Sequence, residues 1–186
     1  MLEYEQGRPA DFSSRAAKEQ RVYELLDSLG IEYGRVDHEH ADTIEACQVI
    51  ETVLGAPICK NLFLTNRQGT EFYLLLLPGD KPFKTKFFSK LIGSSRLSFA
   101  GAEDMEKYLD ITPGSVSVLG LMNDREKAVH LYIDKPVVEG EYIGCHPCLN
   151  TSTLKIRTSD ILQKLLPHLG VEAGIIDLPI EMEEEA

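Results

Sequence analysis

Apolar residues along the first quarter of the chain follow helical spacing, interrupted by a short strand pattern. From residue 13 to Gly30, apolar side chains recur every three or four positions, which predicts a helix. Residues 31–36 predict a short strand. Asp42 and Glu45 resemble a capping box for a second helix, which is expected to end before Gly55.

The middle of the chain changes to a strand pattern. Residues 58–65 and 70–77 predict two strands joined by a four-residue loop, which indicates an antiparallel hairpin. The run Leu74 to Leu77 is apolar without alternation. A strand with this pattern is buried on both faces, so we expect it to lie centrally in its sheet.

Later segments repeat both patterns, with a second hairpin expected over 115–133 and a last helix frayed by Pro167. The expected elements are helices over 82–92, 103–109 and 159–169, and strands over 115–119, 128–133, 142–143 and 153–156. Because hairpins and helices interleave without a βαβ rhythm, the predicted class is α+β, a single domain with a mixed, mostly antiparallel sheet and flanking helices. We expect an N-terminal arm over 1–12, the domain over 13–170 and an acidic tail over 171–186.

Composition supports an ordinary globular domain of 186 residues, with 43% hydrophobic and 26% charged positions. The net charge of −11 disfavours, at first sight, a partner made of phosphates. That charge is uneven, however. Residues 80–96 carry a net charge of +4, whereas the last ten residues carry −5.

The N-terminal sequence, the apolar runs and the few cysteines bear on where in the cell the protein is located. The N-terminus lacks a secretory signal pattern, and the longest apolar run, Tyr73 to Leu77, is far shorter than the roughly 20 residues of a membrane span. We therefore expect a cytoplasmic protein with reduced thiols and no membrane contact.

The tetrad Cys145-His146-Pro147-Cys148 is the first candidate for chemistry, as a redox dithiol or half of a zinc site. Cys47 and Cys59 lie far upstream and are widely spaced, and the residues after Cys148 are poor helix formers. We prefer the interpretation that these thiols are bystanders. On that interpretation no metal is expected, and since the glycine patterns of nucleotide sites are missing, no cofactor is expected either. The serine hydrolase elbow is missing as well.

Lys60 stands out because it interrupts an apolar strand pattern. It either extends from an edge strand into solvent or places an ammonium in a cleft that binds an anion or an ester carbonyl. Three glycine-containing turns are further candidates, although each is also explained as simple turn punctuation. They are 113–115, 120–123 and the G-x-H-P-x-x-N-T segment at 144–151.

Taken in order, these segments resemble the YbaK/ProX family of prolyl-tRNA editing proteins. The resemblance rests on Lys60 in C-K-N-L-F-L, the T-P-G-S-V-S-V-L-G-L segment at 112–121, Asn123-Asp124 and the G-C-H-P-C-L-N-T segment at 144–151. It spans about residues 13–170 and is closest to the free-standing ProX branch. That branch removes alanine from proline tRNA, whereas the YbaK branch is associated with cysteine.

The resemblance implies a trans-editing hydrolase that deacylates mischarged proline tRNA, mainly Ala-tRNA(Pro), without a covalent intermediate. It implies catalytic roles for Lys60, His146 and Asn150, with Lys60 holding the carbonyl or a phosphate, His146 positioning the amine or water, and Asn150 orienting His146 or the ribose. Backbone amides at 114–117 and 144–146 are expected to bind the oxyanion. The implied substrate-binding residues are Gly114, Ser115, Val116, Ser117, Gly120, Asn123, Gly144 and Thr151.

The expected partner is the acceptor end of proline tRNA, with prolyl-tRNA synthetase as a second partner to test and no role for DNA. The basic stretch supplies the expected tRNA contacts, Lys81, Lys84, Lys86 and Lys90, to which Lys155 and Arg157 are candidate additions. Three alternatives stay open: a cysteine- or serine-specific deacylase of the same fold, a non-catalytic tRNA- or synthetase-binding module, and a thiol oxidoreductase.

Overall fold

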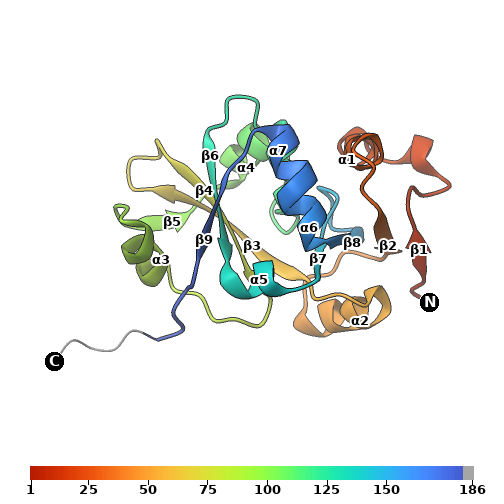
Figure 1. Ribbon diagram of the computed structural model, residues 1–186, viewed down its shortest axis with the longest axis horizontal. Helices are drawn as coiled ribbons and strands as arrows, with labels where there is room; N and C mark the ends of the chain where they lie inside the picture. Colours follow the sequence, from red (N-terminus) through yellow and green to blue (C-terminus); the bar gives the residue numbers. More distant parts are fainter. Residues whose placement is uncertain (182–186) are drawn as a thin grey trace.

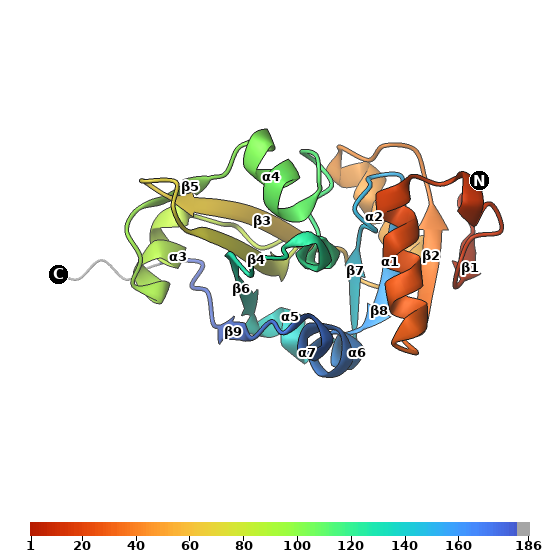
Figure 2. The same cartoon turned by 90° about the horizontal axis from the view of Figure 1, so that it is seen from above.

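The computed structural model describes residues 1–181 and contains two β-sheets joined by helices (Figures 1 and 2). One sheet has the antiparallel order β1-β2-β8-β7, and the other has the mixed order β5-β3-β4-β6-β9. The strands are β1 (Tyr4–Gln6), β2 (Tyr33–Asp37), β3 (Cys59–Asn66), β4 (Phe72–Pro78), β5 (Leu97–Phe99), β6 (Val129–Asp134), β7 (Tyr142–Cys145), β8 (Ser152–Arg157) and β9 (Ala173–Ile176). The predicted α+β class is confirmed, with two sheets in place of one.

The helices cover both sheets and connect them (Figure 2). The α-helices are α1 (Ala17–Ser28), α2 (Ile44–Leu54), α3 (Thr85–Ile92), α4 (Ala102–Leu109), α5 (Lys135–Glu139), α6 (Thr158–Asp160) and α7 (Leu166–Leu169). Short 3-10 helices span Phe12–Ser14 and Val118–Asn123, and a π-helical turn, Ile161–Leu165, joins α6 to α7. Of the described helices, none has both the length and the apolar character that a membrane span requires.

The last helix does not fray at Pro167 as the sequence predicted. Proline lacks an N–H group and its ring clashes with the carbonyl four residues earlier, so it disrupts α-helical bonding in the preceding turn. The chain accommodates Pro167 in the first turn of α7, directly after the π-helical turn, and the helix continues to Leu169.

The β3–β4 hairpin is confirmed, and β4 is the central strand of its sheet. Leu74 and Leu76 pack into the main core, which contacts both sheets, while Leu75 and Leu77 pack into a second core beneath α3. All four side chains are fully buried. The apolar run lacks alternation because each face of β4 contacts a different core.

The expected second hairpin is wrong. Residues 115–117 form no strand, and the Ser117 hydroxyl accepts a hydrogen bond from Leu119 N (3.2 Å), which caps the 3-10 helix over Val118–Asn123. Strand β6 pairs in parallel with β4 and with β9. Since Ser117, Val118 and Leu119 are all buried, their polar and apolar alternation does not mark a half-exposed strand.

Both chain ends extend the sheets beyond the expected domain. Within the expected arm, β1 pairs with β2, with Tyr4 opposite Val36. Within the expected tail, β9 pairs with β6, and Leu178 N donates to buried Asp134 Oδ1 (2.9 Å). The acidic end of the expected tail, residues 182–186, lies outside the described residues.

Helix α2 begins at a side-chain cap and ends at a glycine. The N-cap is Thr43, whose hydroxyl accepts from Ala46 N (3.1 Å), rather than the predicted Asp42. Gly55 ends the helix in the left-handed region, at a φ of 71°. Glu51 then accepts from Ile58 N (2.8 Å), which fixes α2 against the start of β3.

Candidate active site at the junction of the two sheets

Gly144 joins the two sheets. Its N–H donates to Pro57 O (2.8 Å), and Ile58 and Gly144 form an isolated parallel bridge. A Cβ at position 144 would lie 2.7 Å from Pro57 O, which is closer than real contacts allow, so the close approach requires glycine. The junction brings the G-x-H-P segment next to the strand that carries Lys60.

His146 follows the junction and is held by one of its ring nitrogens. Nδ1 lies 2.8 Å from Ser152 O, and because a carbonyl only accepts, Nδ1 carries the hydrogen. Nε2 of the neutral ring therefore carries the lone pair, and within residues 1–181 no hydrogen bond engages it. Burial lowers the pKa of His146, the charges of His38 and His40 lower it further, and the Ser152 carbonyl opposes the shift.

His38 stands across from His146 at a ring-centroid distance of 6.0 Å. Its Nε2 bonds Thr153 Oγ1 (2.8 Å), and its Nδ1 donates to Glu39 O (2.7 Å). The sequence singled out neither His38 nor Thr153. The signal available was the dense D-H-E-H-A-D-T run at 37–43, which holds two of the five histidines.

Asn150 holds the 38–43 loop and, among the residues that the structure describes, makes no hydrogen bond to His146, so its expected catalytic role stays a prediction. Its Nδ2 donates to Ala41 O (3.1 Å) and its Oδ1 accepts from Ala41 N (3.4 Å), so both ends of the amide are engaged by one backbone unit. The side chain is buried. The Gly114 turn lies beside it: a Cβ at Gly114 would sit 3.8 Å from Asn150 Nδ2 and 3.7 Å from His40 Cε1.

Lys60 comes from the other sheet. Its half-buried side chain lies on the face of β3 shared with Leu62 and Leu64, and Nζ donates to Lys81 O (2.8 Å). Within residues 1–181, no hydrogen bond joins Lys60 to His146 or Asn150. Both motifs thus reach the junction from separate sheets without direct contact.

Two of the backbone amides expected to bind an oxyanion are already engaged. Ser115 N donates to Thr112 O (3.1 Å), and Gly144 N donates to Pro57 O. These two N–H groups are satisfied within the fold, so any oxyanion donor must come from other groups.

Several of the expected substrate-binding residues make contacts within the fold. Ser117 caps the 3-10 helix, Asn123 Nδ2 donates to Leu109 O (2.8 Å), and Val116 packs on the main core. A Cβ on Gly120 would lie 2.5 Å from Ile111 Cδ1. Thr151 is exposed, and its carbonyl accepts from His38 N (3.0 Å).

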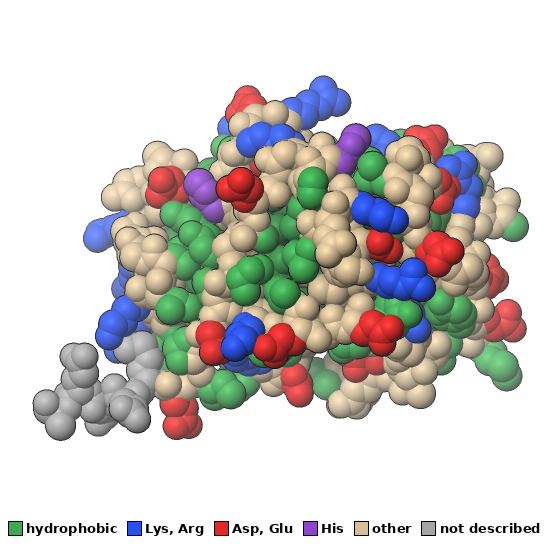
Figure 3. Space-filling model, viewed as in Figure 1, with side chains coloured by type: hydrophobic (Ala, Val, Ile, Leu, Met, Phe, Trp, Pro, Cys, Tyr) green, Lys and Arg blue, Asp and Glu red, His purple; other side chains and the backbone are tan. Residues whose placement is uncertain are grey.

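The basic residues divide between opposite ends of the molecule. Lys84, Lys86 and Lys90 are exposed on α3, and Figure 3 shows Lys and Arg side chains along that edge. Lys155 and Arg157 lie on β8, far from α3 (Figures 1 and 2).

Lys81 differs from the α3 lysines. Its Nζ pairs with Asp134 Oδ2 at 2.7 Å, and the two side chains are only 10% and 0% exposed. The Lys81 ammonium is thus engaged within the fold, and its contact with tRNA, like that of the α3 lysines, stays a prediction.

Comparison with known proteins decides the family. Residues 38–164, more than half of the chain, match the family described as the aminoacyl-tRNA editing domain. The chain belongs to this family. The prolyl-tRNA editing protein ProX of Acetoanaerobium sticklandii is 34% identical over 159 residues, covering 86% of this chain and 96% of the relative. Prolyl-tRNA synthetase associated domain-containing protein 1 of Danio rerio is 29% identical, covering 76% of this chain and 78% of the relative.

Solved structures share the editing-domain fold. A protein described provisionally as a trans-editing enzyme for prolyl tRNA synthetase matches 88% of this chain and 98% of its own, with a TM-score of 0.64 and 17% identity. At that identity the likeness concerns the fold alone. The matched range, 38–164, contains Lys60, Gly114, Gly144, His146 and Asn150.

The cysteines of this editing domain pack in its interior. Cys145 and Cys148 are 1% and 0% exposed, and burial raises the pKa of both thiols, that of Cys148 to about 12. Such thiols stay protonated at neutral pH and are poor nucleophiles, which supports the bystander interpretation. No group of three or more His, Cys, Asp or Glu side chains within residues 1–181 is placed to hold a metal ion.

Proposed function

We propose that this protein is an editing deacylase that hydrolyses the aminoacyl ester of mischarged proline tRNA, with Ala-tRNA(Pro) as its main substrate. The observation that carries the proposal is the G-x-H-P-x-x-N-T segment, folded so that His146 keeps a free Nε2 beside the Gly144 junction. The similarity to a prolyl-tRNA editing protein over 96% of that relative's length supports the same assignment.

The reaction needs little covalent chemistry from the protein. A water oxygen attacks the ester carbonyl carbon, the bond to the ribose oxygen breaks, and that oxygen takes a proton, which releases the amino acid and the intact tRNA. An aminoacyl ester is already activated, so positioning the water and stabilising the developing oxyanion provide most of the acceleration.

His146 has the geometry of the group that handles the proton. With Nδ1–H bound to Ser152 O, Nε2 accepts a hydrogen bond from the attacking water or from the substrate amine. Its lowered pKa keeps the ring neutral at pH 7. In this proposal the 2′-hydroxyl of the terminal ribose assists the same proton transfer.

Lys60 supplies positive charge from the second sheet. Its ammonium is held by a single carbonyl, Lys81 O, so two of its three N–H donors are open to a phosphate or to the ester carbonyl. The open donors also compensate for the two engaged amides, Ser115 N and Gly144 N.

The α3 lysines, Lys84, Lys86 and Lys90, are the proposed contact for the tRNA acceptor end. All three are exposed; Lys84 is the N-cap residue of α3, and Lys86 and Lys90 lie on the helix. Contact through a few lysines gives weak, salt-sensitive binding, which suits an enzyme that must release its product.

The deciding experiment is deacylation of proline tRNA charged with alanine, cysteine, serine or proline. We expect Ala-tRNA(Pro) to be hydrolysed fastest and Pro-tRNA(Pro) to survive, since a pocket that fits alanine excludes the proline ring by steric clash. Fastest hydrolysis of the cysteine or serine ester would reassign the specificity within the same reaction. Binding of tRNA by the folded protein without turnover of any ester would overturn the enzyme assignment in favour of a tRNA-binding module.

A further inference from the structure

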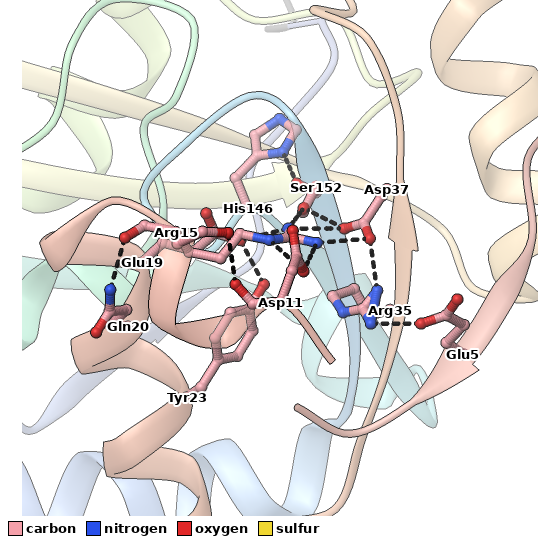
Figure 4. A network of polar contacts seen from close by, with 11 residues as sticks. Glu5, Asp11, Arg15, Glu19, Gln20, Tyr23, Arg35, Asp37, His146 and Ser152 are labelled. Carbon is pink, nitrogen blue, oxygen red and sulfur yellow. Dashed lines mark hydrogen bonds and ion pairs between the residues drawn. The ribbon is translucent and has the colours of Figure 1, made fainter. Parts of the chain in front are cut away.

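A network of charged side chains lies directly behind His146 (Figure 4). At its centre the Arg15 guanidinium forms a two-point contact with Asp37, Nη1 to Oδ1 at 3.1 Å and Nη2 to Oδ2 at 3.0 Å. Arg15 also contacts Asp11 and Glu19. A fork-to-fork contact of this kind fixes both the distance and the orientation of the carboxylate.

Ser152 connects this network to His146. Its hydroxyl donates to Asp37 Oδ1 (2.6 Å) and accepts from Arg15 Nη1 (3.3 Å), while its carbonyl accepts from His146 Nδ1 (2.8 Å). Ser152 is fully buried. One residue therefore contacts the charged network through its side chain and the histidine through its backbone.

A second arginine holds Asp37 from the opposite side. Arg35, whose side chain is 2% exposed, donates to Asp37 Oδ2 (2.7 Å) and to Glu5 Oε2 (2.6 Å) on β1. Burial opposes ionisation of Asp37, but hydrogen bonds from Arg15 and Ser152 and the charge of Arg35 outweigh it and lower the pKa of Asp37. The carboxylate stays charged and cannot rotate freely.

The network is a poor device for stability alone. The Arg15 and Glu19 side chains are 17% and 3% exposed, and Arg35 is 2% exposed, whereas Asp37 is 40% exposed. Taking charged groups out of water is costly, and apolar residues of similar volume commonly stabilise a fold at least as well as buried ion pairs. Such networks do define orientation, because each partner has fixed geometry. Arg15, Arg35 and Asp37 also lie outside residues 38–164, which match the editing family.

We propose that Asp37, held by Arg15, is a positioning residue for His146 and acts through Ser152. By fixing the Ser152 carbonyl, it selects the His146 tautomer with hydrogen on Nδ1 and leaves Nε2 directed to the substrate. The inference rests on the proposed deacylase function for its kinetic consequence, but the tautomer is a property of the free protein.

The test compares Asp37→Asn and Ser152→Ala in the full-length protein, with Asp110→Asn as the matched control. Asp110 accepts from Arg21 of helix α1, makes no hydrogen bond with His146, and sits at a φ of 52°, which asparagine tolerates. Long-range proton–nitrogen NMR spectra, assigned with His146→Ala, report which ring nitrogen carries hydrogen. Steady-state deacylation of Ala-tRNA(Pro) separates kcat from KM.

In the unaltered protein and in the control variant Asp110→Asn, we expect the hydrogen of the neutral His146 ring to lie on Nδ1 and not on Nε2. Asp37→Asn and Ser152→Ala should populate the second tautomer and lower kcat by roughly 10- to 100-fold, with KM changed by less than about twofold. Arg15→Lys keeps the positive charge but loses the two-point contact with Asp37, so its kcat should lie between that of these two variants and that of the unaltered protein.

Different failures have different meanings. An unchanged tautomer and unchanged kcat in both variants, even with a lowered melting temperature, would show that the network only stabilises the fold and would overturn the inference. A tautomer shift in a protein that hydrolyses no mischarged tRNA would support the positioning role and overturn the proposed function. If Asp37→Asn does not fold, Ser152→Ala decides the question, because it removes a single buried hydroxyl.

Discussion

His146 and Lys60 come from different sheets and are held in opposite ways. His146 and Lys60 are both half-buried, but His146 is bonded to Ser152 and backed by two arginines and several carboxylates, whereas Lys60 is held by a backbone carbonyl. Lys81, which provides that carbonyl, is itself fixed by its buried pair with Asp134. The structure thus fixes His146 through several hydrogen bonds behind it, whereas the long Lys60 side chain is held by one hydrogen bond at its end.

The difference matches what each group is proposed to do. A group that handles a proton must hold its geometry to within a fraction of an ångström, so its support is built into the folded protein. A group that contacts a charged substrate over a longer range needs reach and open donors. The comparison therefore assigns tight positional requirements to His146 and looser ones to Lys60.

The largest expected effect is that of His146→Ala. Losing the free Nε2 should lower kcat for Ala-tRNA(Pro) by about 10²- to 10⁴-fold, the usual contribution of a proton-handling group. His168→Ala, which removes an exposed histidine at the end of α7, is the matched control and should keep full activity. Single-turnover deacylation measures both; near-normal hydrolysis by His146→Ala would remove it from the chemical step.

Lys60→Ala should have the next largest effect. Removal of one charge-assisted contact, worth roughly 1.5–3 kcal/mol, corresponds to about a 10- to 100-fold loss in kcat/KM. Lys60→Arg should recover part of this loss, because it keeps the positive charge and the positional requirements at Lys60 are looser than those at His146. Lys135→Ala, on an exposed lysine of α5, serves as the control. Complete inactivity of Lys60→Arg would contradict the proposed difference between the two sides.

A smaller effect is expected on the α3 lysines. The double variant Lys84→Glu, Lys86→Glu should raise KM for tRNA several-fold and weaken its dependence on salt, with kcat unchanged. The pair Lys135→Glu, Lys164→Glu makes the same change in charge at exposed sites elsewhere. Equal KM values in the two double variants would mean that α3 makes no specific tRNA contact.

The smallest effect concerns pH. Burial lowers the pKa of His146, with contributions from His38 and His40, so kcat/KM should fall on the acid side with a midpoint below the usual histidine value of about 6.5. Because the unfolded chain binds this proton more readily, stability from neutral His146 is present above about pH 6.5 and is lost as the pH falls through the lower, folded pKa. The pH profile of kcat/KM for Lys60→Ala should show the same fall at acid pH. A midpoint above 6.5 in the unaltered protein would contradict the assignment of this fall to His146.

Local signals were enough to predict much of the fold. The β3–β4 hairpin, the central place of β4 and the helices near α1, α2, α3 and α4 depend on spacing, turns and uninterrupted apolar runs. The prediction of a second hairpin was wrong because 115–119 alternates polar and apolar residues while both its serines, Val118 and Leu119 are buried and Val116 is half-buried. The pairing of β6 with β4 and β9 depends on contacts distant in sequence, which periodicity cannot report.

The candidate site divides in the same manner. The motif residues Lys60, Gly144 and His146 were visible in the sequence because of their residue types and order. Ser117, Gly120 and Asn123 were visible for the same reason, yet they cap and pack the 3-10 helix and its contact with α4. A turn residue that serves the substrate and one that serves the fold look alike until their neighbours are known.

By itself, the sequence determined the α+β class, most element positions and the motif that marks an editing domain. Only the tertiary structure decided that the expected arm pairs with β2 and that Arg15, Asp37 and Ser152 converge behind His146. The reason is physical. Spacing reports which side of an element is buried, whereas a hydrogen-bond network depends on distances of a few ångströms between residues that folding alone brings together.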